Sequence, residues 1–146
     1  MLTIDADPIR SLPAEVLTQC LGLVDPRDLR TLEMGGTVIC ISRTDRGVQR
    51  EYPAFQVWPG IAGEPIQRII SALSTYAPAD SVGTYGFFTS PDKLLGELTP
   101  IEVLLGRLLS PRGRYPEAME LLEWSPDRRL EAVLGSAKAL AECWNS

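Results

Sequence analysis

The sequence contains no histidine, and this absence argues against several kinds of catalytic and metal site at once. Ser–His and Cys–His nucleophile pairs both need an imidazole base. The three cysteines, Cys20, Cys40 and Cys143, are far apart and form no CxxC pair, so neither a zinc site nor a disulfide framework is expected. The residue types therefore favour a protein that is not an enzyme.

Long apolar runs and an excess of basic charge are also missing. No uninterrupted apolar stretch approaches the roughly 20 residues that span a bilayer, and the first residues lack the basic start and apolar run of a signal peptide. Together with the cysteine pattern, this predicts a cytoplasmic protein that does not enter a membrane. The net charge of −5 argues against a dedicated non-specific nucleic-acid binder, because phosphate neutralisation needs a basic surface.

The sequence does contain enough apolar material for a core, together with clear signals for helix starts. Hydrophobic residues make up 45% of the 146 residues, a length that suits one domain or two small lobes. Capping side chains precede proline, which is favoured at the first helical position, in Asp25-Pro26, Ser90-Pro91, Thr99-Pro100 and Ser125-Pro126. We expect a helix to start at each pair, with a capping box between Thr99 and Glu102.

A mainly helical fold with a small β-hairpin, an α+β arrangement, follows from the pattern between these starts. Apolar spacing and glycine stops predict helices over residues 13–22, 26–33, 65–76, 79–89, 99–109 and 126–144. The β-branched run 37–42 and residues 49–58 predict two strands joined by a turn at 43–47. The last helix carries one apolar stripe, made of Leu130, Val133, Leu134, Ala137, Leu140 and Trp144.

The second predicted strand holds the segment YPAFQVW, residues 52–58, which is largely apolar on both faces. Strand alternation places its side chains in two sets: Tyr52, Ala54, Gln56 and Trp58 on one face, and Pro53, Phe55 and Val57 on the other. Pro53 cannot donate to a ladder, which predicts an edge or strand-terminal position. Gln56 must find backbone partners if it is buried. A strand that is apolar on both faces predicts a joint between two lobes.

An ordered set of motifs resembles the toxin-binding domain of Xre/MbcA/ParS-type antitoxins. That family shows an aromatic-Pro-x-Phe-Gln strand, an apolar pair, a polar-Pro-polar turn, Leu-Gly and a Thr-Pro helix start. The matching residues here are Tyr52, Pro53, Phe55 and Gln56, then Phe87-Phe88, Ser90-Pro91-Asp92, Leu95-Gly96 and Thr99-Pro100. The closing helix of the family resembles RRLEAVLGSAKALAE, so the resemblance covers about residues 50–143.

The resemblance implies a short N-terminal lobe, residues 1–50, followed by a helical toxin-binding domain, residues 51–146. It also implies an antitoxin of a type II toxin–antitoxin system, which neutralises a cognate toxin enzyme, often of the RES class, and forms a homodimer or a larger oligomer. The chemistry then belongs to the partner, so the resemblance implies no cofactor for this chain. We expect the end of the last helix to carry the toxin contact, with Trp144 as an aromatic anchor and Glu131, Lys138 and Glu142 beside it.

Residues 13–42 resemble the compact helix-turn-helix and β-hairpin of some members of the same family, which leaves a DNA-binding regulator as an alternative. Helix 26–33 would then occupy the recognition position, and the contacts to DNA would come from Arg27, Arg30, Arg43, Arg46 and Arg50. Residues 1–50 carry six basic and seven acidic side chains, so the expected binding is weak. An orphan adaptor that kept the fold is a third hypothesis.

Overall fold

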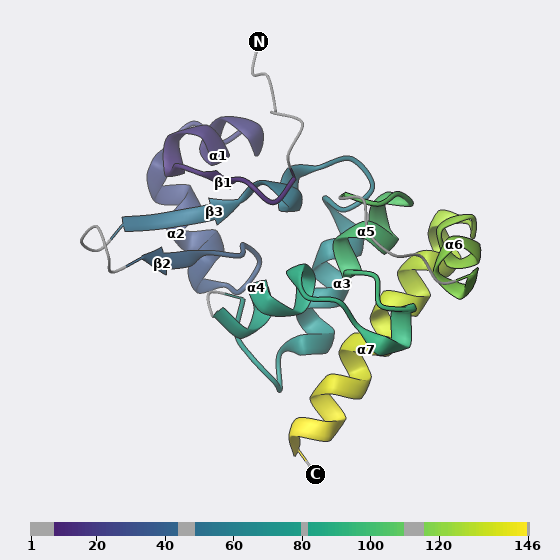
Figure 1. Cartoon of the computed structure of the whole chain (residues 1–146). Helices are drawn as coiled ribbons and strands as arrows, with labels where there is room; N and C mark the ends of the chain where they lie inside the picture. Colours follow the sequence, from purple (N-terminus) through teal and green to yellow (C-terminus); the bar gives the residue numbers. More distant parts are fainter. Residues whose placement is uncertain (1–7, 44–48, 80–81, 110–115, 146) are drawn as a thin grey trace.

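The computed structural model describes residues 8–43, 49–79, 82–109 and 116–145, and over these ranges the chain is mainly helical with a small antiparallel sheet (Figure 1). The N-terminal part contains β1 (Ser11–Leu12), α1 (Ala14–Cys20), α2 (Pro26–Met34), β2 (Ile41–Arg43) and β3 (Gln49–Pro53). Next come the 3₁₀ turn η1 (Ala54–Val57), α3 (Glu64–Leu73), α4 (Val82–Thr89) and the 3₁₀ turn η2 (Lys93–Leu95). The chain ends with α5 (Pro100–Leu105), α6 (Pro116–Leu122) and α7 (Pro126–Asn145).

The sheet has three strands in the order β1-β3-β2, and both pairings are antiparallel. Ser11 lies opposite Pro53 and Ile41 lies opposite Glu51. β1 was not predicted, because two residues carry no periodicity. β2 is much shorter than the predicted strand 37–42, since Ile39 pairs with a side chain instead of a neighbouring strand. The predicted turn at 43–47 lies mostly outside the described residues, and Arg43 still belongs to β2.

The prediction of one strand over residues 49–58 is wrong in its second half. β3 ends at Pro53, and Ala54–Val57 form the 3₁₀ turn η1. The expected alternation of faces therefore fails, because the consecutive residues Ala54, Phe55 and Gln56 are all buried. Pro53 does occupy a strand-terminal position, as its missing N–H requires, although β3 is the central strand of the sheet.

Three of the four predicted helix starts are confirmed by their capping bonds. The Asp25 carboxylate accepts the Arg27 N–H before α2, and the Ser125 hydroxyl accepts the Arg128 N–H before α7. Thr99 and Glu102 form the predicted capping box of α5. The start predicted at Ser90-Pro91 is wrong. The Ser90 N–H donates to the Gly86 carbonyl, so Ser90 continues the hydrogen bonding of the preceding helix α4 and does not begin a new one.

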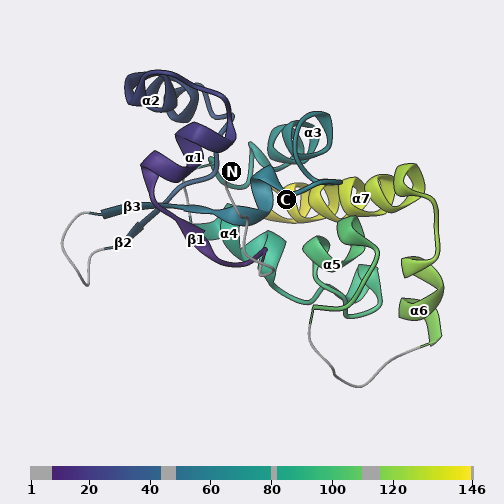
Figure 2. The ribbon, with the colours of Figure 1, turned by 90° about the horizontal axis from the view of Figure 1, so that it is seen from above.

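Two hydrophobic clusters meet at the β3–η1 junction. The smaller cluster joins α1, α2 and the sheet, and its buried members are Leu17, Leu29, Val38, Cys40 and Tyr52. The larger cluster lies among α3, α4, α5, α6 and α7 and includes Phe55, whose ring centroid is 4.9 Å from that of Phe88. Figure 2 shows α1 and α2 on one side of the molecule and α3, α5, α6 and α7 on the other. Tyr52 thus belongs to the smaller cluster and Phe55 to the larger one, on the two sides of the junction. The predicted boundary between an N-terminal lobe and a toxin-binding domain at residue 50 stays a prediction.

Across the ranges that the structure describes, no helix combines the length and the apolarity that a bilayer crossing requires.

Candidate partner-binding surface

Gln56 holds the two hydrophobic clusters together through a set of buried hydrogen bonds. Its Oε1 accepts the Ile39 N–H at 2.9 Å, and its Nε2 donates to the Ile39 carbonyl at 2.9 Å and to the Pro53 carbonyl at 3.1 Å. Ile39 itself is fully buried. The expectation that a buried Gln56 must bond to backbone is therefore confirmed, and the amide stands where a neighbouring strand would otherwise satisfy Ile39.

The turn between α4 and α5 is attached to α7 through Asp92. One carboxylate oxygen of Asp92 accepts the Leu94 N–H and caps η2, and the other accepts a short hydrogen bond from the Ser136 hydroxyl of α7. Pro91, the motif residue before it, is exposed, and Leu95 after it is buried. The polar-Pro-polar motif therefore fixes the turn against the middle of α7, and it does not start a helix.

Gly96 is required by both its backbone conformation and its surroundings. Its φ is +65°, a conformation that residues with a side chain rarely adopt. A Cβ at this position would also lie 3.2 Å from the Cα of Ala118 on α6. The Leu-Gly motif thus allows α6 to pack directly on the turn.

α5 is closed at both ends by side chains. At its start the Thr99 N–H bonds to the buried Glu102 carboxylate at 3.0 Å, and the Glu102 N–H bonds to the Thr99 hydroxyl at 3.2 Å. At its end Arg129 of α7 donates from Nη1 to the Val103 and Leu104 carbonyls, at 3.0 and 3.1 Å. These bonds satisfy groups that a helix end leaves unpaired, and they lock α5 to the base of α7.

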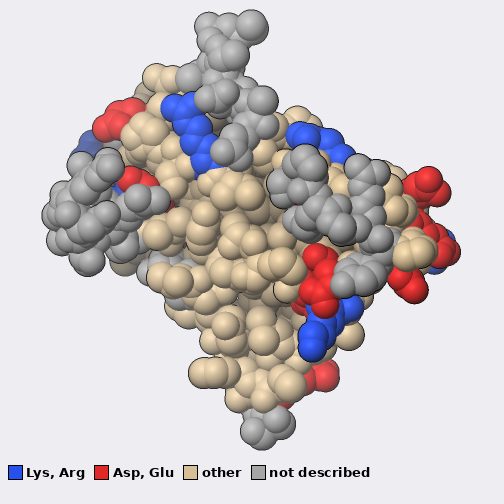
Figure 3. Space-filling model, in the orientation of Figure 1, with Lys and Arg blue, Asp and Glu red and all other residues tan. Residues whose placement is uncertain are grey.

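The free end of α7 carries a large exposed aromatic side chain. Figure 1 shows the last turns of α7 extending below the other helices to the C-terminus. Trp144, near its end, is 66% exposed and meets Tyr76 edge to face, with ring centroids 5.5 Å apart. Figure 3 shows that uncharged residues dominate the centre and the lower, C-terminal part of this side of the molecule.

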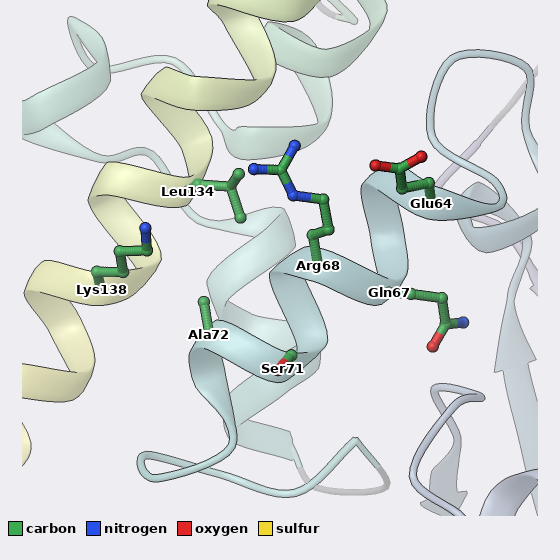
Figure 4. Close-up of a pocket in the computed structure, with 7 residues that line it drawn as sticks. All are labelled: Glu64, Gln67, Arg68, Ser71, Ala72, Leu134 and Lys138. Carbon is green, nitrogen blue, oxygen red and sulfur yellow. The ribbon is translucent and has the colours of Figure 1, made fainter.

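A shallow groove of about 420 Å³ lies between α3 and α7, and Figure 4 shows the side chains that line it. α3 contributes Glu64, Gln67, Arg68, Ser71 and Ala72, and α7 contributes Leu134 and Lys138. Arg68 extends toward Leu134 on the facing helix, whereas Gln67 points away from α7 (Figure 4). Arg68 Nη2 also lies 3.2 Å from the Glu131 carboxylate, which makes an ion pair across the groove.

The structure places the four predicted toxin-binding residues along one helix, but in different settings. Glu131 is engaged by Arg68 at one end of the groove, and Lys138 lines the groove further along α7. Glu142 is exposed one helical turn beyond Lys138, and Trp144 lies near the tip. Sequence reasoning missed Arg68 of α3 and Tyr76, which follows the end of α3. The polar face of α3 can be recognised from the sequence, but no sequence signal indicates that this face packs beside α7.

The predicted DNA-binding arginines are largely engaged with acidic side chains. Arg27 lies 2.9 Å from the Asp25 carboxylate, Arg30 lies 3.3 Å from Glu33, and Arg50 lies 3.0 Å from Glu33. Arg46 lies outside the described residues, and only the backbone of Arg43 is described. The ion pairs of Arg27, Arg30 and Arg50 leave less free positive charge on this lobe than the arginine count implies.

Glu33 is the buried centre of a polar network under the sheet. It is 7% exposed and accepts the Tyr52 hydroxyl at 2.8 Å in addition to Arg50. Burial opposes its ionisation, but hydrogen bonds from Cys40, Tyr52 and Arg50 outweigh burial, so the pKa of Glu33 is lowered. Burial and the neighbouring Glu33 charge raise the pKa of the Cys40 thiol to about 12, which leaves it protonated and unreactive at neutral pH.

The acidic residues do not assemble into a metal site in the part of the chain that the structure describes. No group of three or more histidine, cysteine, aspartate or glutamate residues there could hold a metal ion. Glu117, Glu120 and Glu123 are exposed on or just after α6, as expected for a solvated acidic face. None of the three cysteines, which all lie within the described residues, forms a disulfide, and Cys143 is exposed near the end of α7.

Comparison with known proteins gives no match of any kind: no family model, no curated protein and no solved structure matches this chain.

Proposed function

We propose that this protein is an antitoxin that binds and neutralises a partner toxin enzyme, with the free end of α7 as its principal contact. The observation that carries the proposal is Trp144, a tryptophan that is 66% exposed near the end of a 20-residue helix. Tryptophan is enriched at the energetic centres of protein interfaces, because it buries a large area with few rotatable bonds. An exposed tryptophan at a free helix end therefore suits insertion into a partner.

The motifs that resemble the antitoxin family support the proposal because their residues make structural contacts that position α7. Gln56 joins the two clusters, Asp92 bonds to Ser136, and Gly96 admits α6. Each of these residues helps to position α7 or the helices packed on it. An architecture built around one presented helix suits a protein that neutralises an enzyme by covering its active site.

The proposal assigns the chemistry to the partner and self-association to this chain. A cytoplasmic setting and a homodimer or larger oligomer belong to the same proposal. The regulator alternative receives less support, because Arg27 and Arg30 are each paired with an acid on or beside the helix that would read DNA. Like charge between the exposed Asp28 and a phosphate backbone would further weaken binding.

The test is co-expression with the product of the adjacent gene, followed by co-purification and growth measurement. We expect the wild-type chain to purify with that product and to relieve its toxicity. Trp144→Ala should weaken both effects, while Val24→Ala, which removes a 97% exposed side chain from the other lobe, should change neither. An adjacent product that is not toxic, or toxicity that the wild-type chain does not relieve, would contradict the proposal.

A further inference from the structure

We infer that α3 supplies the second half of the toxin-binding surface, and that the groove between α3 and α7 takes a toxin segment that carries a carboxylate beside an apolar side chain. This inference rests on the proposed function, and it adds a second site and the chemistry of its occupant. It follows from the charges in the groove, from the groove's floor and from its position next to Trp144.

The first argument is the distribution of charge. Arg68 is neutralised by Glu131 at 3.2 Å, so that pair attracts no further charge strongly. Glu64, the other charged residue in the lining, lies at the start of α3, away from Lys138 and beyond Arg68 (Figure 4). Lys138 is exposed in the same groove and makes no ion pair or hydrogen bond with any residue that the structure describes. A partner that covered this ammonium without a counter-charge would leave it desolvated and unpaired, which is costly. The complementary occupant is therefore an aspartate or glutamate.

The second argument is the composition of the floor. Between the charged residues the groove is lined by Ser71 and Ala72 of α3 and by the buried Leu134 of α7. Small and apolar side chains at this place let a partner's backbone approach closely and bury an apolar group. A free small anion would gain nothing from that floor, whereas a protein segment would use it together with Lys138.

The third argument is continuity with the aromatic tip. Trp144 lies six residues after Lys138, about 9 Å further along the helix axis. The Trp144 ring contacts Tyr76, which lies shortly after the end of α3. Ser71 and Ala72 of the groove lie in the last turn of the same helix. α7 is therefore flanked by α3 at the groove and by Tyr76, just after α3, at Trp144. A hot-spot aromatic surrounded by such contacts is the usual anatomy of a tight interface.

The experiment compares matched variants in binding to the product of the adjacent gene, with dissociation constants measured by calorimetry. The chain has only two lysines, so Lys138→Glu is paired with Lys93→Glu, the same charge change at an exposed site on η2. Ser71→Trp, which fills the groove, is paired with Thr75→Trp, which adds the same bulk at an exposed position outside it. Melting temperatures of all four variants are measured alongside.

We expect Lys138→Glu and Ser71→Trp each to weaken binding by about tenfold or more, and the two control variants to bind within about twofold of wild type. Replacing the facing carboxylate of the toxin by lysine should restore binding to Lys138→Glu. If Trp144→Ala loses binding while both groove variants bind as wild type does, the groove is not part of the interface and the proposed function survives. If the wild-type chain binds no toxin, both proposals fail.

Discussion

The substitution Gln56→Leu tests whether one side-chain amide holds the two halves of this fold together. Leucine has similar bulk but can neither donate nor accept a hydrogen bond. The change removes the bonds to the Ile39 N–H and carbonyl, both at 2.9 Å, and the bond to the Pro53 carbonyl at 3.1 Å. Ile39 is 0% exposed, so water cannot replace the lost partners without opening the structure.

The expected loss of stability can be estimated from these contacts. Each buried backbone group left without a partner costs about 1–3 kcal/mol, and three groups lose this partner: the Ile39 N–H, the Ile39 carbonyl and the Pro53 carbonyl. The leucine side chain recovers part of this, since its burial is favourable by about 1.5–3 kcal/mol relative to exposure. We therefore expect a net loss of about 2–4 kcal/mol, a large share of the roughly 5–15 kcal/mol that stabilises a typical domain.

Urea denaturation followed by circular dichroism measures this loss. With a slope of about 2 kcal/mol per molar urea, the transition midpoint should fall by about 1–2 M. The matched control is Gln67→Leu, whose Nε2 donates to the Thr37 carbonyl at 2.8 Å in an exposed setting. Water can replace that bond, so the control should lose less than about 0.5 kcal/mol. A Gln56→Leu protein within about 1 kcal/mol of wild type would refute the reasoning.

Four further predictions concern stability, pH, neutralisation and DNA. Phe55→Ala should cost about 3–5 kcal/mol in the same assay, because the ring is fully buried against Phe88; a loss below about 1 kcal/mol would remove it from the joint. Because the pKa of Glu33 is lowered from its usual 4.5, its carboxylate stabilises the fold above that pH, and this contribution disappears as the pH falls through the folded-state pKa. Urea midpoints between about pH 6 and pH 3 should therefore fall more for wild type than for Glu33→Gln, and equal falls would contradict the network. Deleting residues 142–146 should leave the melting temperature nearly unchanged but weaken relief of toxicity, and a truncated chain that still protects cells would move the contact elsewhere. Fluorescence anisotropy at physiological salt should show weak binding to duplex DNA, whereas a tight complex abolished by Arg27→Ala with Arg30→Ala would favour the regulator.

Helix starts that follow a capping side chain were the part of this fold that the sequence predicted well, because they depend on local chemistry. The helix ends were predicted less well, since α3 ends at Leu73 and α5 at Leu105, and α6 was not predicted. The capping side chains of Asp25, Thr99 and Ser125 act within their own turns, so no tertiary information was needed. The helix start predicted at Ser90 was wrong because serine can also lie at the end of a preceding helix. Local propensity does not distinguish these two uses.

Residues 54–57 were predicted as strand because their composition is typical of a strand. Their 3₁₀ conformation is instead held by a contact between Gln56 and Ile39, which are 17 residues apart in the chain. Gln56 takes its partners from Ile39, which also removes Ile39 from β2. The need for such partners was predictable, but their identity was not. At the candidate site, Lys138 and Trp144 followed from the pattern of a single helix, whereas Arg68 required knowing which helix packs against α7.

The capping of α5 by Arg129 has a consequence for the order in which the helices form. An isolated helix shorter than about 12–15 residues is marginal in water. α5 has 6 residues and α6 has 7, whereas α7 has 20. The carbonyls at the end of α5 find Arg129 only after the first turn of α7 exists. We therefore expect α7 to be structured early in the folding transition state and α5 late. Substitutions in the first turn of α7 should slow folding, while substitutions near Trp144 should leave the folding rate unchanged. Residues at the end of α7, which is proposed to contact the toxin, can therefore vary without slowing the folding of the protein.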